Sequence, residues 1–130
     1  MPIEQDVAAL ARAANFAAFT TMLPNGHPMT HVMWVDCDAD RVLVNTEVHR
    51  QKYKNVQHDP RVTVTIIDRT NPYRFAEVRG HVVETVGGDE ARRHIDELSQ
   101  KYNGTPYPPE AVQTERVILC IAPNRQLVRG

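Results

Sequence analysis

Residues 16–35 read FAAFTTMLPNGHPMTHVMWV, and this stretch decides the fold class. Residues 16–23 are β-branched, aromatic or small, which is typical of a strand. The Asn25-Gly26 pair that follows tolerates the positive φ angles of a tight hairpin turn. A second strand is predicted from about Met29 to Val35. The stretch therefore predicts two antiparallel neighbouring strands near the start of a β-rich protein.

Two or three short helices are predicted outside this hairpin. Ile3, Val7 and Leu10 recur at helical spacing among polar residues, which indicates a short amphipathic helix that ends before Asn15. Residues 51–57 have no strand alternation and indicate a second short helix. Residues 89–102 carry apolar side chains at helical spacing, and Asn103-Gly104 is typical of a helix C-terminus.

The remaining apolar segments predict further strands. They lie at residues 41–46, 61–67, 73–84 and 117–121, with a short last strand at 127–128. A turn at residues 36–40 is expected to join the first three strands into a meander. Gly80 is expected at a bulge or a close approach of two backbones. Many short strands joined by tight turns predict a mainly β protein, a six- to seven-stranded antiparallel split β-barrel with two or three short helices.

The composition limits the function classes. The 130 residues are expected to form a single domain over residues 1–130. A formal net charge of -1 gives no basic footprint for nucleic acid or for an anionic membrane. Neither a long apolar segment nor a secretory signal is present, so we expect a cytoplasmic protein. Cys37 and Cys120 form no disulfide or zinc pattern, and no metal site is expected.

Positive charge is concentrated in one short segment. Arg50, Lys52, Lys54 and Arg61 place four of the fifteen cations within twelve positions. A strand that ends at Thr46 and turns into a short helix presents free backbone N–H groups, to which these cations add charge-assisted hydrogen bonds for a phosphate. The alternative interpretation is a solvated face whose cations are balanced by Glu47 and Asp59. The charge pattern alone leaves both interpretations open.

The segment from Thr46 to Arg61 reads TEVHRQKYKNVQHDPR and precedes a β-branched strand. With its neighbours it resembles the FMN-binding split-barrel superfamily of pyridoxamine 5'-phosphate oxidase-like proteins, and within it the flavin/deazaflavin oxidoreductase B branch. The further pieces that carry this resemblance are FTT at 19–21, NGHP at 25–28, THVMW at 30–34, NPYR at 71–74 and EVRGHV at 77–82.

The resemblance implies a cofactor site with two parts. The phosphate and ribityl end would be held by Thr46, Arg50, Lys52, Lys54 and Asn55. The flavin or deazaflavin ring would rest against the second strand, largely on its backbone groups, at Thr30, His31, Val32 and Met33. In this family a partner subunit completes the pocket, so a homodimer with the site at the subunit interface is implied.

The segments KYKN at 52–55 and NPYR at 71–74 are more similar to members that use coenzyme F420 than to members that hold FMN. The resemblance thus implies an F420-dependent oxidoreductase that transfers a hydride between the reduced deazaflavin and a small organic substrate. No catalytic side chain can be chosen from the sequence. An FMN-binding flavoprotein of the same fold, and a module that binds the cofactor without turnover, stay open. Vitamin B6 oxidation is disfavoured, because true pyridoxamine phosphate oxidases have a C-terminal segment that supplies an Arg and a His for the substrate phosphate, whereas this chain ends QLVRG.

Overall fold

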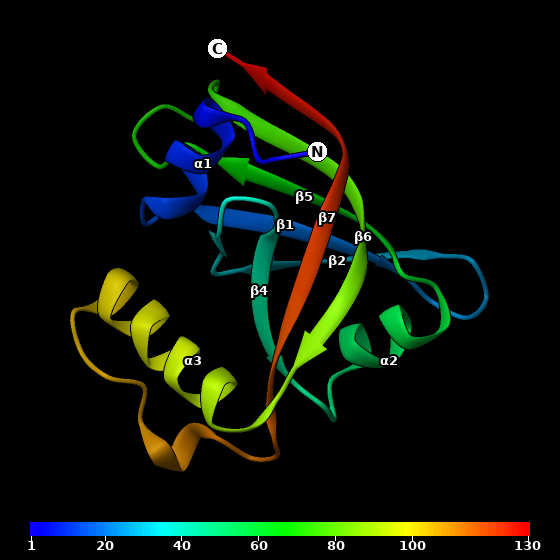
Figure 1. Ribbon diagram of the computed structural model, residues 1–130, viewed down its shortest axis with the longest axis vertical. Helices are drawn as coiled ribbons and strands as arrows, with labels where there is room; N and C mark the ends of the chain where they lie inside the picture. Colours follow the sequence, from blue (N-terminus) through cyan, green and yellow to red (C-terminus); the bar gives the residue numbers. More distant parts are fainter.

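The computed structural model of the chain describes residues 1–130. Seven strands form one antiparallel sheet, and three α-helices and one short 3-10 helix surround it (Figure 1). The strands are β1 (Phe16–Met22), β2 (Pro28–Met33), β3 (Asp36–Cys37), β4 (Val42–Glu47), β5 (Arg61–Ile67), β6 (Phe75–Val86) and β7 (Arg116–Arg129). The helices are α1 (Gln5–Arg12), α2 (Gln51–His58), α3 (Gly88–Asn103) and the 3-10 helix η1 (Pro109–Ala111). The predicted fold class, a mainly β antiparallel split barrel, is confirmed.

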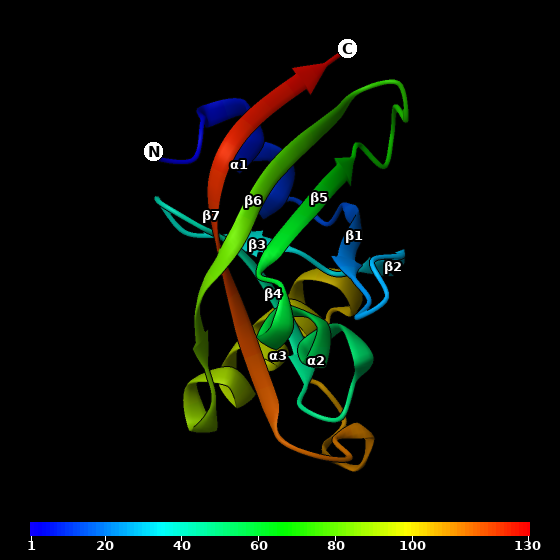
Figure 2. The same ribbon diagram turned by 90° about the vertical axis from the view of Figure 1, so that its right-hand side faces the viewer.

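The order of the strands leaves the barrel open on one side. It runs β2-β1-β5-β6-β7-β4-β3, and every neighbouring pair is antiparallel. The edge strands are β2 and β3, which are not hydrogen-bonded to each other, and Figure 2 shows the curl of the sheet between them. An unpaired edge therefore lies on each side of the opening.

The predicted meander of the first three strands is wrong. β4 pairs with β7 and not with β2. The chain leaves the sheet after Met33, and β3, within the predicted turn at 36–40, pairs only with β4. The turn itself is shorter, and in it the Asp38 carboxylate accepts hydrogen bonds from the backbone N–H groups of Asp40 and Arg41. The link from β2 to β4 thus carries the chain from one edge of the sheet to the other.

The two predicted strands at the C-terminal end are a single strand, β7. Pro123 lies within it, where a proline is tolerated because the pairing with β6 shifts register between Arg79 and Gly80. Gly80 lies at this bulge, as predicted. A Cβ atom on Gly80 would lie 2.2 Å from the carbonyl oxygen of Ala122. The missing side chain is what lets β6 and β7 approach there.

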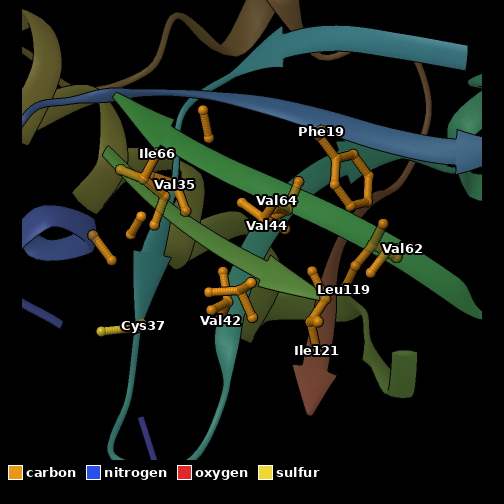
Figure 3. Close-up of a cluster of buried hydrophobic side chains, with 14 of the residues drawn as sticks. Phe19, Val35, Cys37, Val42, Val44, Val62, Val64, Ile66, Leu119 and Ile121 are labelled. Atoms are coloured by element: carbon orange, nitrogen blue, oxygen red, sulfur yellow. The ribbon is translucent and has the colours of Figure 1, made fainter. Parts of the chain in front are cut away.

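The main core fills the concave side of the sheet (Figure 3). Nineteen buried apolar residues from α1, α2 and the sheet form it, with Phe19, Val64 and Leu119 among the most deeply buried. α3 packs on the other face of β4 and β7, where Ala91 meets Ile118 and Cys120. β4 and β7 therefore lie between two layers, and their polar residues on the α3 side are buried as well.

The three helices begin and end close to the predicted positions. Gly104 ends α3 in the left-handed conformation, with φ of 75°. Both cysteines are buried free thiols. None of the helices combines the length and the apolar composition that a membrane span requires.

We expect the Gly80→Ala substitution to destabilise the protein by about 1–3 kcal/mol, because the new methyl group must displace backbone atoms of β7. Gly87→Ala is the matched control, since its Cβ would meet only the flexible carboxylate of Glu115. Urea unfolding of both variants measures the difference. Equal stabilities would show that β6 and β7 are not in close contact at Gly80.

Candidate functional site

The first turn of α2 has no capping side chain. Arg50 occupies the N-cap position and makes no side-chain cap hydrogen bond. The backbone N–H groups of Gln51 and Lys52 have no acceptor in the chain. Free N–H groups and the helix dipole give this end a partial positive charge, which suits an anion.

Lys52 is the most unusual residue of this turn. The residue is only 8% exposed, yet its ammonium group has no hydrogen-bond or ion-pair partner in the chain. Burial lowers the pKa of Lys52, and the positive charges of Arg50 and Arg116 lower it further. Its ammonium is not among the fully buried atoms without a partner, so it is open to solvent or to a ligand at the start of α2.

The carboxylate of Glu47 already has partners within the chain. Glu47 is 1% exposed and accepts hydrogen bonds from the backbone N–H groups of Gln113 and Thr114, at 2.8 Å and 2.6 Å. Its second oxygen lies 3.3 Å from Nη1 of Arg116. Burial raises the pKa of Glu47, but the two N–H donors and Arg116 outweigh this and lower it, so the carboxyl is ionised at neutral pH.

Glu47 and Asp59 therefore do not balance Arg50 and Lys52, although Arg50 is exposed to solvent. Asp59 pairs with Arg61, at 2.6 Å, and Glu47 pairs with Arg116. Arg50 forms no ion pair within the chain, and neither does Lys52. We call Arg50, Lys52 and the free N–H groups of the first α2 turn the clamp.

The other residues predicted for the phosphate end lie in different surroundings. Thr46 is buried at the end of β4, and its hydroxyl makes no hydrogen bond in the chain. Lys54 is exposed. Asn55 is fully buried, donates to the hydroxyl of Thr21 at 2.9 Å and accepts from Gln51 at 2.8 Å. Its amide holds α2 against β1.

The four residues predicted for the ring lie on the unpaired edge strand β2. They alternate between the two faces of the sheet, so they do not form one surface. Thr30 and Val32 point to the outer face, where the hydroxyls of Thr30 and Thr20 are hydrogen-bonded at 2.8 Å. Met33 packs against the core from the inner side. What the four share is a backbone edge without a partner strand, which agrees with contact through backbone groups.

A cavity of about 290 Å³ lies beside the open edge of β2. Its walls are mostly apolar, and its two polar residues are Asn45 and Arg116. We call it the slot; Phe16, Val32, Met33, Trp34, Ile95 and Tyr107 form its apolar walls. Arg116 thus faces the slot and is also close enough to Lys52 to affect its pKa.

Trp34 is held rigidly in the wall of the slot. Its ring is stacked on Tyr102 of α3, with centroids 5.1 Å apart, and meets Tyr107 edge-on. The hydroxyl of Tyr102 donates to the carbonyl oxygen of Asn15 and contacts the backbone of Val35. These bonds fasten the end of α3 to the segment that follows β2.

Sequence reasoning missed Arg116, Asn45 and Glu47. They are adjacent in space because Glu47 and Arg116 are cross-strand neighbours on β4 and β7. In the sequence, however, Glu47 and Arg116 lie 69 positions apart. A charged residue directly before the buried strand of residues 117–121 was the one available signal, and it does not indicate a partner.

Comparison with known proteins agrees with this fold. Residues 3–128 match the family described as pyridoxamine 5'-phosphate oxidase. A solved structure named F420 reductase is similar, with 30% identity, a TM-score of 0.84, and coverage of 96% of this chain and 98% of that one. No curated protein matches the sequence.

Two other solved structures share the fold at lower identity. A conserved hypothetical protein from Mycobacterium tuberculosis has a TM-score of 0.78 at 24% identity, with coverage of 98% of this chain and 84% of that one. A putative pyridoxamine 5'-phosphate oxidase from Listeria innocua has a TM-score of 0.70 at 17% identity, with coverage of 95% and 94%.

The open antiparallel barrel and these comparisons together define a flavin- or deazaflavin-binding split-barrel protein. The chain belongs to the pyridoxamine 5'-phosphate oxidase family. This confirms the resemblance drawn from the residues of the clamp and the strands around it.

We expect Lys52→Met to raise the melting temperature of the ligand-free protein, because partial burial and the charges of Arg50 and Arg116 disfavour the charged form of Lys52 in the folded state, and Met keeps the volume. The folded-state pKa of Lys52 is lowered, so the penalty applies where Lys52 is charged in both states and fades as the pH rises toward the unfolded value of about 10.4. The difference between the two proteins should therefore shrink in alkaline buffer.

Lys54→Met is the control, since Lys54 is exposed and its loss should change the melting temperature little. Thermal unfolding between pH 7 and pH 10 provides the measurement. A Lys52→Met protein that melts lower than the wild type at pH 7 would contradict the claim that this ammonium lacks a partner.

Proposed function

We propose that the protein binds coenzyme F420 and acts as an F420-dependent oxidoreductase, reducing a small organic substrate. The observation that carries this proposal is the unpartnered ammonium of Lys52 beside Arg50 at the uncapped start of α2. Family membership and the similar structure named F420 reductase support it.

The residues of the clamp fit a phosphodiester or phosphate. Arg50 and Lys52 would donate charge-assisted hydrogen bonds, and the free N–H groups of Gln51 and Lys52 would add the helix dipole. The hydroxyl of Thr46 is a further donor, and Lys54 and Asn55 remain part of the proposed phosphate and ribityl site. The clamp therefore binds and orients the cofactor's charged end.

The bound deazaflavin would supply the hydride chemistry, a transfer of two electrons and one proton between its ring and a carbon of the substrate. The chain's part is to orient the ring along the free edge of β2, at Thr30, His31, Val32 and Met33, and to exclude water. The second proton would come from solvent or from a side chain that we do not assign. No nucleophilic side chain is needed.

Two alternatives share the same fold. One is an FMN-binding flavoprotein, since the clamp recognises a phosphate and does not read the ring. The other is a module that binds the cofactor without turnover. The name of the similar structure favours F420 and enzymatic reduction over both.

We expect Arg50→Ala and Lys52→Ala each to weaken F420 binding by about tenfold to more than a hundredfold, because each removes one charge-assisted contact of ~1.5–3 kcal/mol. Trp34 is the single tryptophan and directly follows β2, the strand proposed to hold the ring, so quenching of its emission reports the titration. Arg93→Ala, on the exposed side of α3, is the control.

The same titration with FMN separates the two cofactors, and incubation of reduced F420 with a panel of organic acceptors separates turnover from storage. Binding of F420 without FMN binding, together with acceptor-dependent oxidation, is the expected result. Unchanged affinity in both clamp variants would place the anion site elsewhere.

We further propose that the protein is a homodimer whose cofactor site lies at the subunit interface, in the cytoplasm. The outer face of β2, β1 and β5 supports this proposal. Phe16, Val32 and Ile67 are exposed apolar residues on that face, at 39%, 72% and 36%. Phe16 and Ile67 are direct cross-strand neighbours. An apolar face beside the ring strand is suited to a second copy that covers both.

We expect Ile67→Glu to shift the protein from dimer to monomer in sedimentation velocity and to weaken F420 binding, because a charge would be placed in the apolar interface. Val83→Glu, an exposed apolar residue of β6, is the matched control. A wild-type protein that sediments as a monomer at all concentrations would refute the dimer.

A further inference from the structure

The slot has one charged group, and its hydrogen bonds are only partly used. Nε of Arg116 donates to Oδ1 of Asn45 at 2.8 Å, and Nη1 lies 3.3 Å from Glu47. Nη2 makes no hydrogen bond within the chain, and it is not among the fully buried atoms without a partner. The guanidinium therefore keeps free donors at the wall of the slot.

Hydrogen bonds hold the side-chain amide of Asn45 in the orientation that points its oxygen at Arg116. Its Nδ2 donates to the carbonyl oxygen of Ala91 and to Nδ1 of His94, both at 3.0 Å. The amide nitrogen is occupied on that side, so Oδ1 is left to accept from Arg116. His94 thereby acts as a positioning residue for the guanidinium, through Asn45.

Arg116 is also held on its other sides. Glu47 is itself anchored by the N–H groups of Gln113 and Thr114. The ring of Tyr107 lies against the guanidinium, 5.3 Å from its Cζ atom. Arg116 is thus preorganised at the slot, whereas Arg50 of the clamp is exposed and unpaired.

The shape and charge of the slot limit what can enter it. Trp34 and Tyr107 meet at 88°, so they form a rigid corner of two flat surfaces. Arg116 is the only charged residue in the lining, and the charges of Arg116 and Arg50 both reach Lys52 next to it. A flat apolar body with one anionic group satisfies both conditions.

We propose that the slot is the substrate subsite, that its substrate is a flat conjugated carboxylate, and that Arg116 binds the carboxylate group. This inference rests on the proposed function, since it assigns the clamp and the backbone edge of β2 to the cofactor, and the side-chain walls of the slot to the molecule that the cofactor reduces. Arg116 then determines specificity, and Asn45 and His94 position it. A neutral molecule of the same shape leaves the donors of Arg116 unmatched.

Binding of small aromatic acids tests this assignment. The probes are 2-naphthoate, its neutral match 2-naphthamide, and the non-planar decalin-2-carboxylate, each titrated by calorimetry into the full chain with and without F420. We expect 2-naphthoate to bind about tenfold or more tightly than either of the other two. F420 should not compete with it.

Two variants separate the slot from the clamp. Arg116→Met should reduce the affinity for 2-naphthoate to that for the amide, with a far smaller effect on F420 than Lys52→Met has. Lys52→Met should do the reverse. Arg93→Met serves as the control for the loss of one positive charge. In the wild-type protein, the Nε–H resonance of Arg116 should shift on addition of 2-naphthoate, a test that needs no folded variant.

Three results would overturn the proposal: equal affinity for the acid and the amide, displacement of 2-naphthoate by F420, or a loss of F420 binding in Arg116→Met as large as in Lys52→Met. The proposed function fails separately. If F420 does not bind while 2-naphthoate shows its Arg116-dependent preference, the cofactor assignment is wrong and the anion-selective slot stands.

Discussion

The pairing of β7 with two different neighbours is the constraint on which the structure depends. β7 pairs with β6 along most of its length and with β4 over its first half, so it is the strand that joins the two halves of the sheet. The bulge at Gly80 and Pro123 bends this pairing. Because the sheet curls without closing, its edge strands β2 and β3 do not pair with each other, and the slot lies between residues of β2 and β4. The slot thus lies where the sheet does not close into a barrel.

Much of the fold can be predicted from the sequence because its signals are local. The Asn25-Gly26 turn, the alternation of residues 61–67 and the Asn103-Gly104 helix end each depend on a few adjacent residues. The meander failed because strand order is not local: nothing in residues 29–46 shows that the chain crosses to the far edge. The split of β7 into two predicted strands failed at Pro123, whose tolerance depends on a bulge shared with β6.

The residues of the candidate site likewise differ in whether the sequence alone could identify them. Arg50 and Lys52 could be singled out because they are neighbours in the sequence and match a family pattern. Arg116 could not, because its role depends on its position opposite Glu47 across two strands. The alternation of Thr30 to Met33 shows the limit of a carried-over segment: consecutive residues of a strand point to opposite faces, so they share a backbone edge and not a surface. Asn55 binds Thr21 and Gln51 through its amide, a contact that only the packing of α2 on β1 reveals.

The place of β7 in the chain also has a consequence for how the protein is made. β7 is the last of the seven strands to be synthesised, yet β4 and β6 have no complete pairing without it. The β1–β2 and β5–β6 hairpins connect segments that are close in sequence and can form early, whereas β4 must wait for residues about seventy positions later. During that interval β4 exposes an apolar edge, Val42 and Val44 included, that is prone to pairing with other chains. We therefore expect the pairing of β7 with β4 to compete with the aggregation of chains in which β4 is still unpaired.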